Sequence, residues 1–109
     1  MNIQRTNLIQ EARKQETPFW KRVADDLEKS SRRRIEVNLS RIARASSEGE
    51  TIIVPGKVLG NGDVPHKVRV VAFSFSSSAQ KKLKEAKCES MRLDEFLKKH
   101  PQGSGRIIG

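Results

Sequence analysis

The segment GKVLGNGDVPHKVRVVAFSFSSSAQKKLKEA, residues 56–86, joins a glycine-rich turn to an apolar strand and then to the start of a helix. Val68–Phe75 is the longest strand candidate in the chain. Its side chains would alternate between two faces, with Val68, Val70 and Ala72 on one and Val71, Phe73 and Phe75 on the other. Both faces are largely apolar, so we expect this strand to lie sandwiched inside the protein.

A helix is predicted directly after this strand. Ser77 and Gln80 match the S-x-x-Q capping box that marks a helix start. The expected inner face holds Ala79, Leu83 and Ala86, and the expected outer face holds Lys81, Lys82, Lys84 and Lys87. An extended link over residues 88–91 leads to a last helix, which ends before Pro101, and the tail beyond it could add an edge strand.

The first half of the chain predicts mainly helix. Ile3, Leu8, Ile9 and Ala12 lie close to one face of a first helix. Thr17 suits the N-cap of a second helix and Pro18 its first position. The apolar stripe of that helix predicts core contacts; it consists of Phe19, Trp20, Val23, Ala24 and Leu27. The helix is expected to end at Ser30 and Ser31.

Short elements connect the two halves. Residues 37–43 could form a short strand or one or two turns of helix, and Ser46–Gly49 a loop. Thr51–Val54 predicts a strand that stops at Pro55, with a second short strand over Lys57–Leu59. A chain of 109 residues fits one domain, with a helical part over residues 1–48 and a mixed part over residues 49–109, so we expect the α+β class (α/β-like).

The charge balance indicates a polyanionic partner. The chain has 22 Lys and Arg against 13 acidic residues, a net charge of +9 and a pI near 10.2. Nucleic acid is the commonest partner of so basic a domain, ahead of an anionic membrane surface. No stretch is apolar enough for a signal peptide or a membrane span. The single cysteine excludes an internal disulfide, fits a reducing compartment such as the cytoplasm, and with two histidines cannot build a Cys-rich zinc site.

Enzyme motifs do not fit the chain. Gly56-Lys57 lacks the rest of a P-loop, and Pro65 stands where a dinucleotide fingerprint needs its third glycine. Ser78 and Lys81 match the short S-x-x-K pattern without its companion motifs, and Cys88 is expected to be a small buried side chain. We therefore expect no catalytic residues, no cofactor and no small-molecule substrate.

Basic residues gather in three groups along the sequence, and an RNA surface explains them together. The candidate RNA-binding residues are Arg32, Arg33, Arg34, Arg41 and Arg44; Gly56, Lys57, Gly60, Gly62, Lys67 and Arg69 around the glycine turn; and Lys81 and Lys82. Arginine and lysine bind phosphates, and glycines let a backbone approach one closely. A tight hairpin with positive φ would also explain the glycines. With no tyrosine, no RRM motif and no G-x-x-G loop, recognition of RNA shape is favoured over base readout.

Two stretches also resemble a known family. Residues 54–83 follow the pattern V-P-G-K-V-L-G-x-G, then K-V-x-V-x-A-x-x-F-S, then S-A-x-x-K-I, with Leu83 at the last position. PFWKRVADDLEKSSRRRIEVNLSRI, residues 18–42, is similar to W-x-x-V-A-x-x-L-x-x-P-x-R-x-x-x-E-V-N-[LV]-S-[KR]-I. These motifs resemble the archaeal and eukaryotic large-subunit ribosomal protein L-eighteen-e, grouped with bacterial L-fifteen, over about residues 6–109, and the short chain resembles the archaeal form.

The resemblance implies an irregular β-β-α arrangement after a helical N-terminal part. It also implies a structural role in the 50S subunit of the cytoplasmic ribosome, with large-subunit rRNA and neighbouring ribosomal proteins as partners. The chain departs from the family at Ser30 and Ser31, where proline is usual, and at residues 87–89, where an A-G-G-like turn is usual. Two alternatives stay open: a small chromatin-type protein that coats DNA, and an enzyme that uses Ser78 with Lys81, or Cys88.

Overall fold

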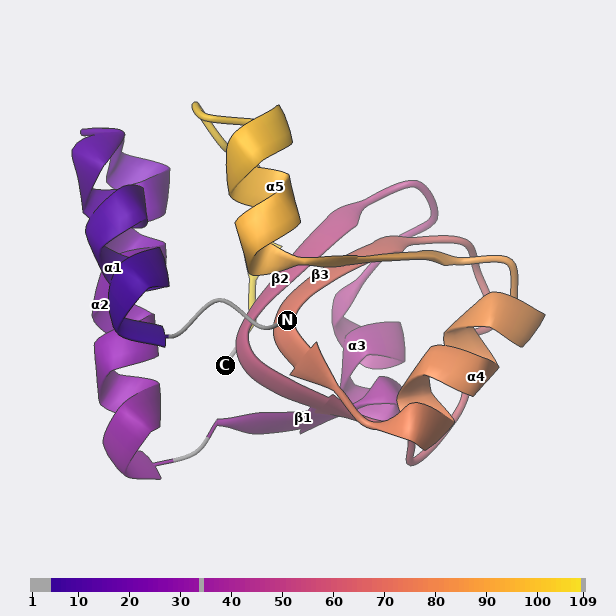
Figure 1. Ribbon diagram of the computed structural model, residues 1–109. Coiled ribbons are helices and arrows are strands. Elements are labelled where there is room, and N and C mark those ends of the chain that lie inside the picture. The colour runs from indigo at the N-terminus through magenta and orange to yellow at the C-terminus, as the bar shows by residue number, and fades with distance from the viewer. Residues whose placement is uncertain (1–4, 34, 109) are drawn as a thin grey trace.

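The computed structural model describes residues 5–33 and 35–108 and shows helices packed on both faces of a five-stranded sheet (Figure 1). The elements are α1 (Arg5–Lys14), α2 (Pro18–Arg33), β1 (Glu36–Asn38), α3 (Leu39–Ala45), β2 (Thr51–Leu59), β3 (Arg69–Phe75), α4 (Ser77–Glu85), β4 (Glu89–Arg92), α5 (Leu93–Lys99) and β5 (Arg106–Ile107). The expected α+β class is confirmed. None of the described helices is long and apolar enough to cross a membrane.

The strands form one parallel sheet with the order β1-β2-β3-β4. β3 pairs along one edge of β2, so β1 and β5 share the other edge, β1 beside residues 57–59 and β5 beside residues 52–53. The hairpin interpretation of the glycine turn is wrong, because β2 and β3 run in the same direction. Residues 60–68 instead carry the chain from the carboxyl end of β2 to the amino end of β3.

Two apolar clusters hold the layers together, one on each face of the sheet. The first joins α1, α2 and α5 to Ile53 of β2 and Val71 of β3. The second joins α3, α4 and the 60–68 connection to the opposite face of the same strands. Val70, Val71 and Ala72 have no exposed surface, which confirms that β3 lies sandwiched inside the protein. The predicted stripe of α2 is also confirmed as core, since Trp20, Val23, Ala24 and Leu27 are fully buried and Phe19 packs against them.

Local signals predicted several boundaries correctly. Thr17 caps α2 through its hydroxyl, which accepts a hydrogen bond of 3.2 Å from the backbone N–H of Trp20. The segment after residue 35 contains both expected alternatives, the strand β1 followed by the helix α3. The tail adds the predicted strand, β5. Ile3 of the predicted first helix lies outside the described residues.

Four local expectations are wrong. β2 continues through Pro55, because its register with β3 shifts between Val54 and Lys57 and a proline without an N–H is tolerated at such an irregularity. Beyond this register shift, Phe75 packs against the cluster that contains Val70 and Ala72, whereas we expected it on the face of Val71. α4 is capped by Ser76, not Ser77, through a 3.1 Å hydrogen bond from the N–H of Ala79. α2 continues past Ser30 and Ser31 to Arg33.

Candidate nucleic-acid interface

The glycine turn, residues 60–62, lies between the starts of α3 and α4. The backbone N–H of Ser40 donates to the carbonyl oxygen of Asn61 at 3.0 Å. A Cβ atom on Gly60 would lie 2.3 Å from the Oγ of Ser78, and one on Gly62 would lie 2.6 Å from the Cβ of Ser40. Gly62 also has a φ of +95°, which side-chain-bearing residues rarely adopt. Both glycines are therefore required by packing within the chain.

A lysine bridge completes this arrangement. The Nζ of Lys82 donates to the carbonyl oxygen of Gly62 at 3.1 Å, which ties the turn to α4. An ammonium group has three donors, so Lys82 can still bind an anion. The two helices that begin beside the turn also carry Arg41, Arg44 and Lys81. We call this surface the turn face; it consists of Arg41, Arg44, Gly60, Gly62, Lys81 and Lys82.

The cations of the turn face are well placed for a polyanion. Arg41, Arg44 and Lys81 are exposed, and none of them takes part in an ion pair with another residue of ranges 5–33 and 35–108. The acidic residues closest to them in sequence, Glu36, Glu48 and Glu85, are exposed and belong to no ion pair among the described residues either. The turn face therefore presents positive charge that the protein does not neutralise.

Gly56 and Lys57 lie in β2, away from the turn. Gly56 is buried, and a Cβ atom on it would lie 2.3 Å from the carbonyl oxygen of Ile35. The same oxygen accepts a hydrogen bond of 2.9 Å from the N–H of Lys57. Strand packing thus accounts for Gly56, whereas Lys57 is exposed and pairs by register with Glu36 of β1.

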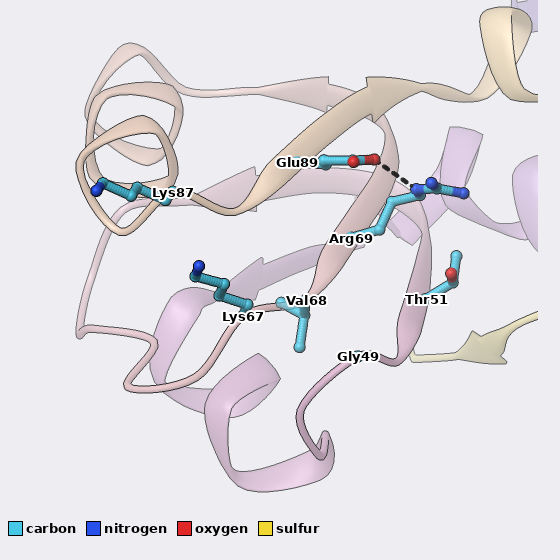
Figure 2. Close-up of a pocket in the computed structure, with 7 residues that line it drawn as sticks. All are labelled: Gly49, Thr51, Lys67, Val68, Arg69, Lys87 and Glu89. Atoms are coloured by element: carbon cyan, nitrogen blue, oxygen red, sulfur yellow. Dashed lines mark hydrogen bonds and ion pairs between the residues drawn. The ribbon is translucent and has the colours of Figure 1, made fainter.

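Lys67 and Arg69 lie at the opposite end of the strands from the glycine turn, although they are close to the turn in sequence. They border a pocket of about 370 Å³ at the amino ends of β2, β3 and β4 (Figure 2). We call it the amino-end pocket; its lining residues are Gly49, Thr51, Lys67, Val68, Arg69, Lys87 and Glu89. The Nε of Arg69 donates to Glu89 at 2.7 Å, so this guanidinium is already paired.

Lys87 is a further basic residue of this pocket; the sequence placed it in the same basic group as Lys81 and Lys82 but not among the candidate RNA-binding residues. Lys87 follows α4, and its N–H donates to the carbonyl oxygen of Lys84 at 3.0 Å. The N–H of the next residue, Cys88, donates to the carbonyl oxygen of Leu83 at 2.9 Å. These two bonds define a Schellman motif, whose central residue takes a positive φ and is usually glycine. Lys87 has a φ of 60°. The expected place of Lys87 on the outer face of the helix is therefore wrong; the signal in the sequence was the A-G-G-like turn that is usual at residues 87–89 in the family that the motifs resemble.

The arginine triplet lies near the end of α2. Arg32 and Arg33 belong to the last turn of that helix, and Arg34 lies outside the described residues. Because the helix continues past its expected end, Arg32 and Arg33 occupy helical positions instead of a loop.

The layer of α1 and α2 differs from the turn face because its charges pair with each other. Arg13 binds both Asp25 and Glu28, and Arg22 binds Asp26 within α2 at 3.3 Å. The hydrogen bond from Arg13 holds the pKa of Glu28 below its usual value. Three cations of this layer, Arg13, Lys14 and Arg22, are therefore paired within the protein.

Ser78 and Cys88, which were considered for catalysis, and the histidine His66 take part in local structure. The Oγ of Ser78 hydrogen-bonds to the Oγ of Ser76 at 3.2 Å. The ring of His66 contacts the Oγ of Ser46 at 2.8 Å, and that hydroxyl donates to the carbonyl oxygen of Ile42. Cys88 is buried, as predicted. Across ranges 5–33 and 35–108, no group of three His, Cys, Asp or Glu side chains could hold a metal ion.

Comparison with known proteins gives a consistent result. Residues 8–108 match the model of the family described as ribosomal protein 60S L18 and 50S L18e. The chain belongs to this family. It is 46% identical to the large ribosomal subunit protein eL18 of Methanoregula boonei, over 98% of this chain and 93% of the relative. It is 45% identical to the protein of the same name from Archaeoglobus fulgidus, over 90% of this chain and 84% of the relative. The resemblance seen in the sequence motifs is confirmed, and the family is one of structural ribosomal proteins, not of enzymes.

Proposed function

We propose that this protein is a structural constituent of the large ribosomal subunit and binds and stabilises large-subunit rRNA. The observation that carries the proposal is the family relationship over residues 8–108, together with relatives named large ribosomal subunit protein over more than four fifths of their length. The net charge of +9 supplies the attraction to a polyanion. The protein acts by binding, with no cofactor and no reaction, in the ribosomes of the cytoplasm.

In this proposal the turn face is the main rRNA contact. Arg41, Arg44 and Lys81 neutralise backbone phosphates, with the arginines able to make bidentate contacts. The packed glycine turn fixes the starts of α3 and α4 relative to each other, so these cations are arranged before RNA arrives. Gly60 and Gly62 serve this contact through the shape of the turn, because Ser78 and Ser40 occupy the space that their side chains would need. Such contacts recognise the shape of a folded RNA, not its base sequence.

The remaining predicted residues have subsidiary places in this proposal. Lys57 reaches the RNA from β2, beside the buried Gly56. Arg32 and Arg33, whose backbone belongs to the end of α2, and Arg34, which lies outside the described residues, are further proposed contacts. The ion-paired part of the α1 and α2 layer, around Arg13 and Arg22, faces neighbouring ribosomal proteins, because surfaces that neutralise their own charge gain little from RNA.

The salt dependence of binding tests the proposal. If about six to ten phosphates are contacted, affinity for large-subunit rRNA falls on the order of 10³–10⁵ between 50 and 200 mM salt. Replacing Arg41, Arg44 and Lys81 together by alanine lowers the slope by about three. The matched control replaces Lys21, Lys98 and Lys99, which are exposed on α2 and α5, and leaves the slope nearly unchanged. A flat salt response of the unmodified protein contradicts the mechanism, and equal affinity for random duplex DNA favours the chromatin-type alternative.

A further inference from the structure

We propose that the amino-end pocket is a separate phosphate site, in which Lys67 and Lys87 hold one phosphate group of an RNA backbone. This inference rests on the proposed function. It adds a second RNA contact, at the opposite end of the strands from the turn face. Lys67 lines the pocket from the connection that precedes β3, and Lys87 lines it from the turn between α4 and β4. Figure 2 shows their ammonium groups on one side of the pocket, away from the Arg69–Glu89 pair.

The charge of the pocket favours an anion. Its lining carries three cations and one carboxylate, a surplus of two positive charges. Because Glu89 already pairs with Arg69, this surplus resides on Lys67 and Lys87. Both lysines are exposed, and neither takes part in an ion pair with any residue in ranges 5–33 and 35–108. An anion in the pocket would therefore meet charges that nothing in the described protein has neutralised.

The size and floor of the pocket match a backbone segment better than a bare ion. Its volume of about 370 Å³ is within the range of sites that hold small organic ligands. Val68 forms a nearly buried apolar floor, with 4% of its surface exposed, and Thr51 adds a hydroxyl at the start of β2. A phosphate with its attached sugar would place the charge near the lysines and the apolar part of the sugar over Val68.

The backbone at Lys87 supports a role in binding. With a φ of 60°, this residue adopts a conformation that favours glycine, yet it carries a long charged side chain at the rim of the pocket. Backbone strain of this kind persists where the rest of the fold enforces it, and it clusters at binding sites. Replacing Lys87 by glycine therefore separates the two roles, since it relieves the backbone while it removes the charge.

The test measures binding of large-subunit rRNA to the full chain over a salt series. Lys67→Ala with Lys87→Gly is expected to weaken binding roughly tenfold and to lower the salt slope by about one, as for loss of one phosphate contact. Lys67→Arg with Lys87→Arg keeps both charges and should retain the slope. The control Lys98→Ala with Lys99→Ala removes the same charge from α5. Thermal melting of each variant confirms that it folds.

The outcomes separate this site from the proposed function. The site is supported if Lys67→Ala with Lys87→Gly, the pocket variant, loses more rRNA affinity than the control. Lys87→Gly alone should then melt at a higher temperature than the unmodified protein and yet bind rRNA more weakly. Equal losses of rRNA affinity in the pocket variant and in the control overturn the phosphate site, while rRNA binding by the unmodified protein still supports the proposed function. Failure of the unmodified protein to bind rRNA instead removes the proposed function. NMR titration with inorganic phosphate covers the free anion: tight binding at Lys67 and Lys87, without an effect of their replacement on rRNA affinity, overturns the RNA assignment.

Discussion

Replacing Gly62 by alanine tests whether the glycine turn is shaped by packing inside the protein. Two costs add at this position. The φ of +95° strains any residue with a Cβ, by about 1–2 kcal/mol. The new methyl would also lie 2.6 Å from the Cβ and 2.8 Å from the backbone nitrogen of Ser40, and such overpacking costs about 1–3 kcal/mol. We expect the free energy of unfolding to fall by about 2–5 kcal/mol.

Gly49 provides a matched control for this variant. Its φ is +86°, but a Cβ atom there would meet nothing within 4 Å, so Gly49→Ala carries the backbone strain without the collision. Urea denaturation followed by circular dichroism gives the free energy of unfolding of both variants. We expect Gly62→Ala to be less stable than Gly49→Ala by about 1–3 kcal/mol, or roughly 4–12 °C in Tm. Equal losses would refute the close approach of the turn to α3.

Four further variants test local features of the fold. Ser76→Ala should lower the free energy of unfolding by about 1 kcal/mol, and Ser77→Ala by much less, because Ser76 caps α4; the reverse order would restore Ser77 as the cap. Lys87→Gly should raise it by about 0.5–1 kcal/mol, and a loss of stability would contradict the strain at that turn. The hydrogen bond from the Ser47 N–H lowers the pKa of Glu50. The stability that this bond gives the folded protein is therefore present at neutral pH and is lost as the pH falls below the ordinary glutamate value of 4.5. Glu50→Gln should therefore be less stable than the unmodified protein at pH 7 in thermal melts, and a gap that persists at pH 3 would refute this linkage.

Features carried by neighbouring residues could be predicted from the sequence. The apolar spacing of α2 depends only on positions within one helix, and the packing of Trp20 and Leu27 followed from it. The run from Val70 to Ala72 likewise required a buried strand, because it is apolar at consecutive positions. Such patterns hold wherever the segment lies in the fold.

Features that depend on distant partners could not be predicted. The glycine turn suggested a hairpin, and only the parallel pairing of β2 with β3 shows that residues 60–68 cross to the other end of the sheet. That crossing separates Lys67 from Gly60 and brings it to Lys87. The close contacts of Gly60 with Ser78 and of Gly62 with Ser40 involve segments that no local pattern connects.

Sedimentation tests the central claim, that this protein is part of the large ribosomal subunit, most directly. A tagged form would be expressed in its own cells, and the extract separated on a sucrose gradient in moderate salt. We expect the protein to migrate with the large subunit and to stay there through a wash at that salt concentration. Migration at the top of the gradient, or with DNA, would contradict the ribosomal assignment.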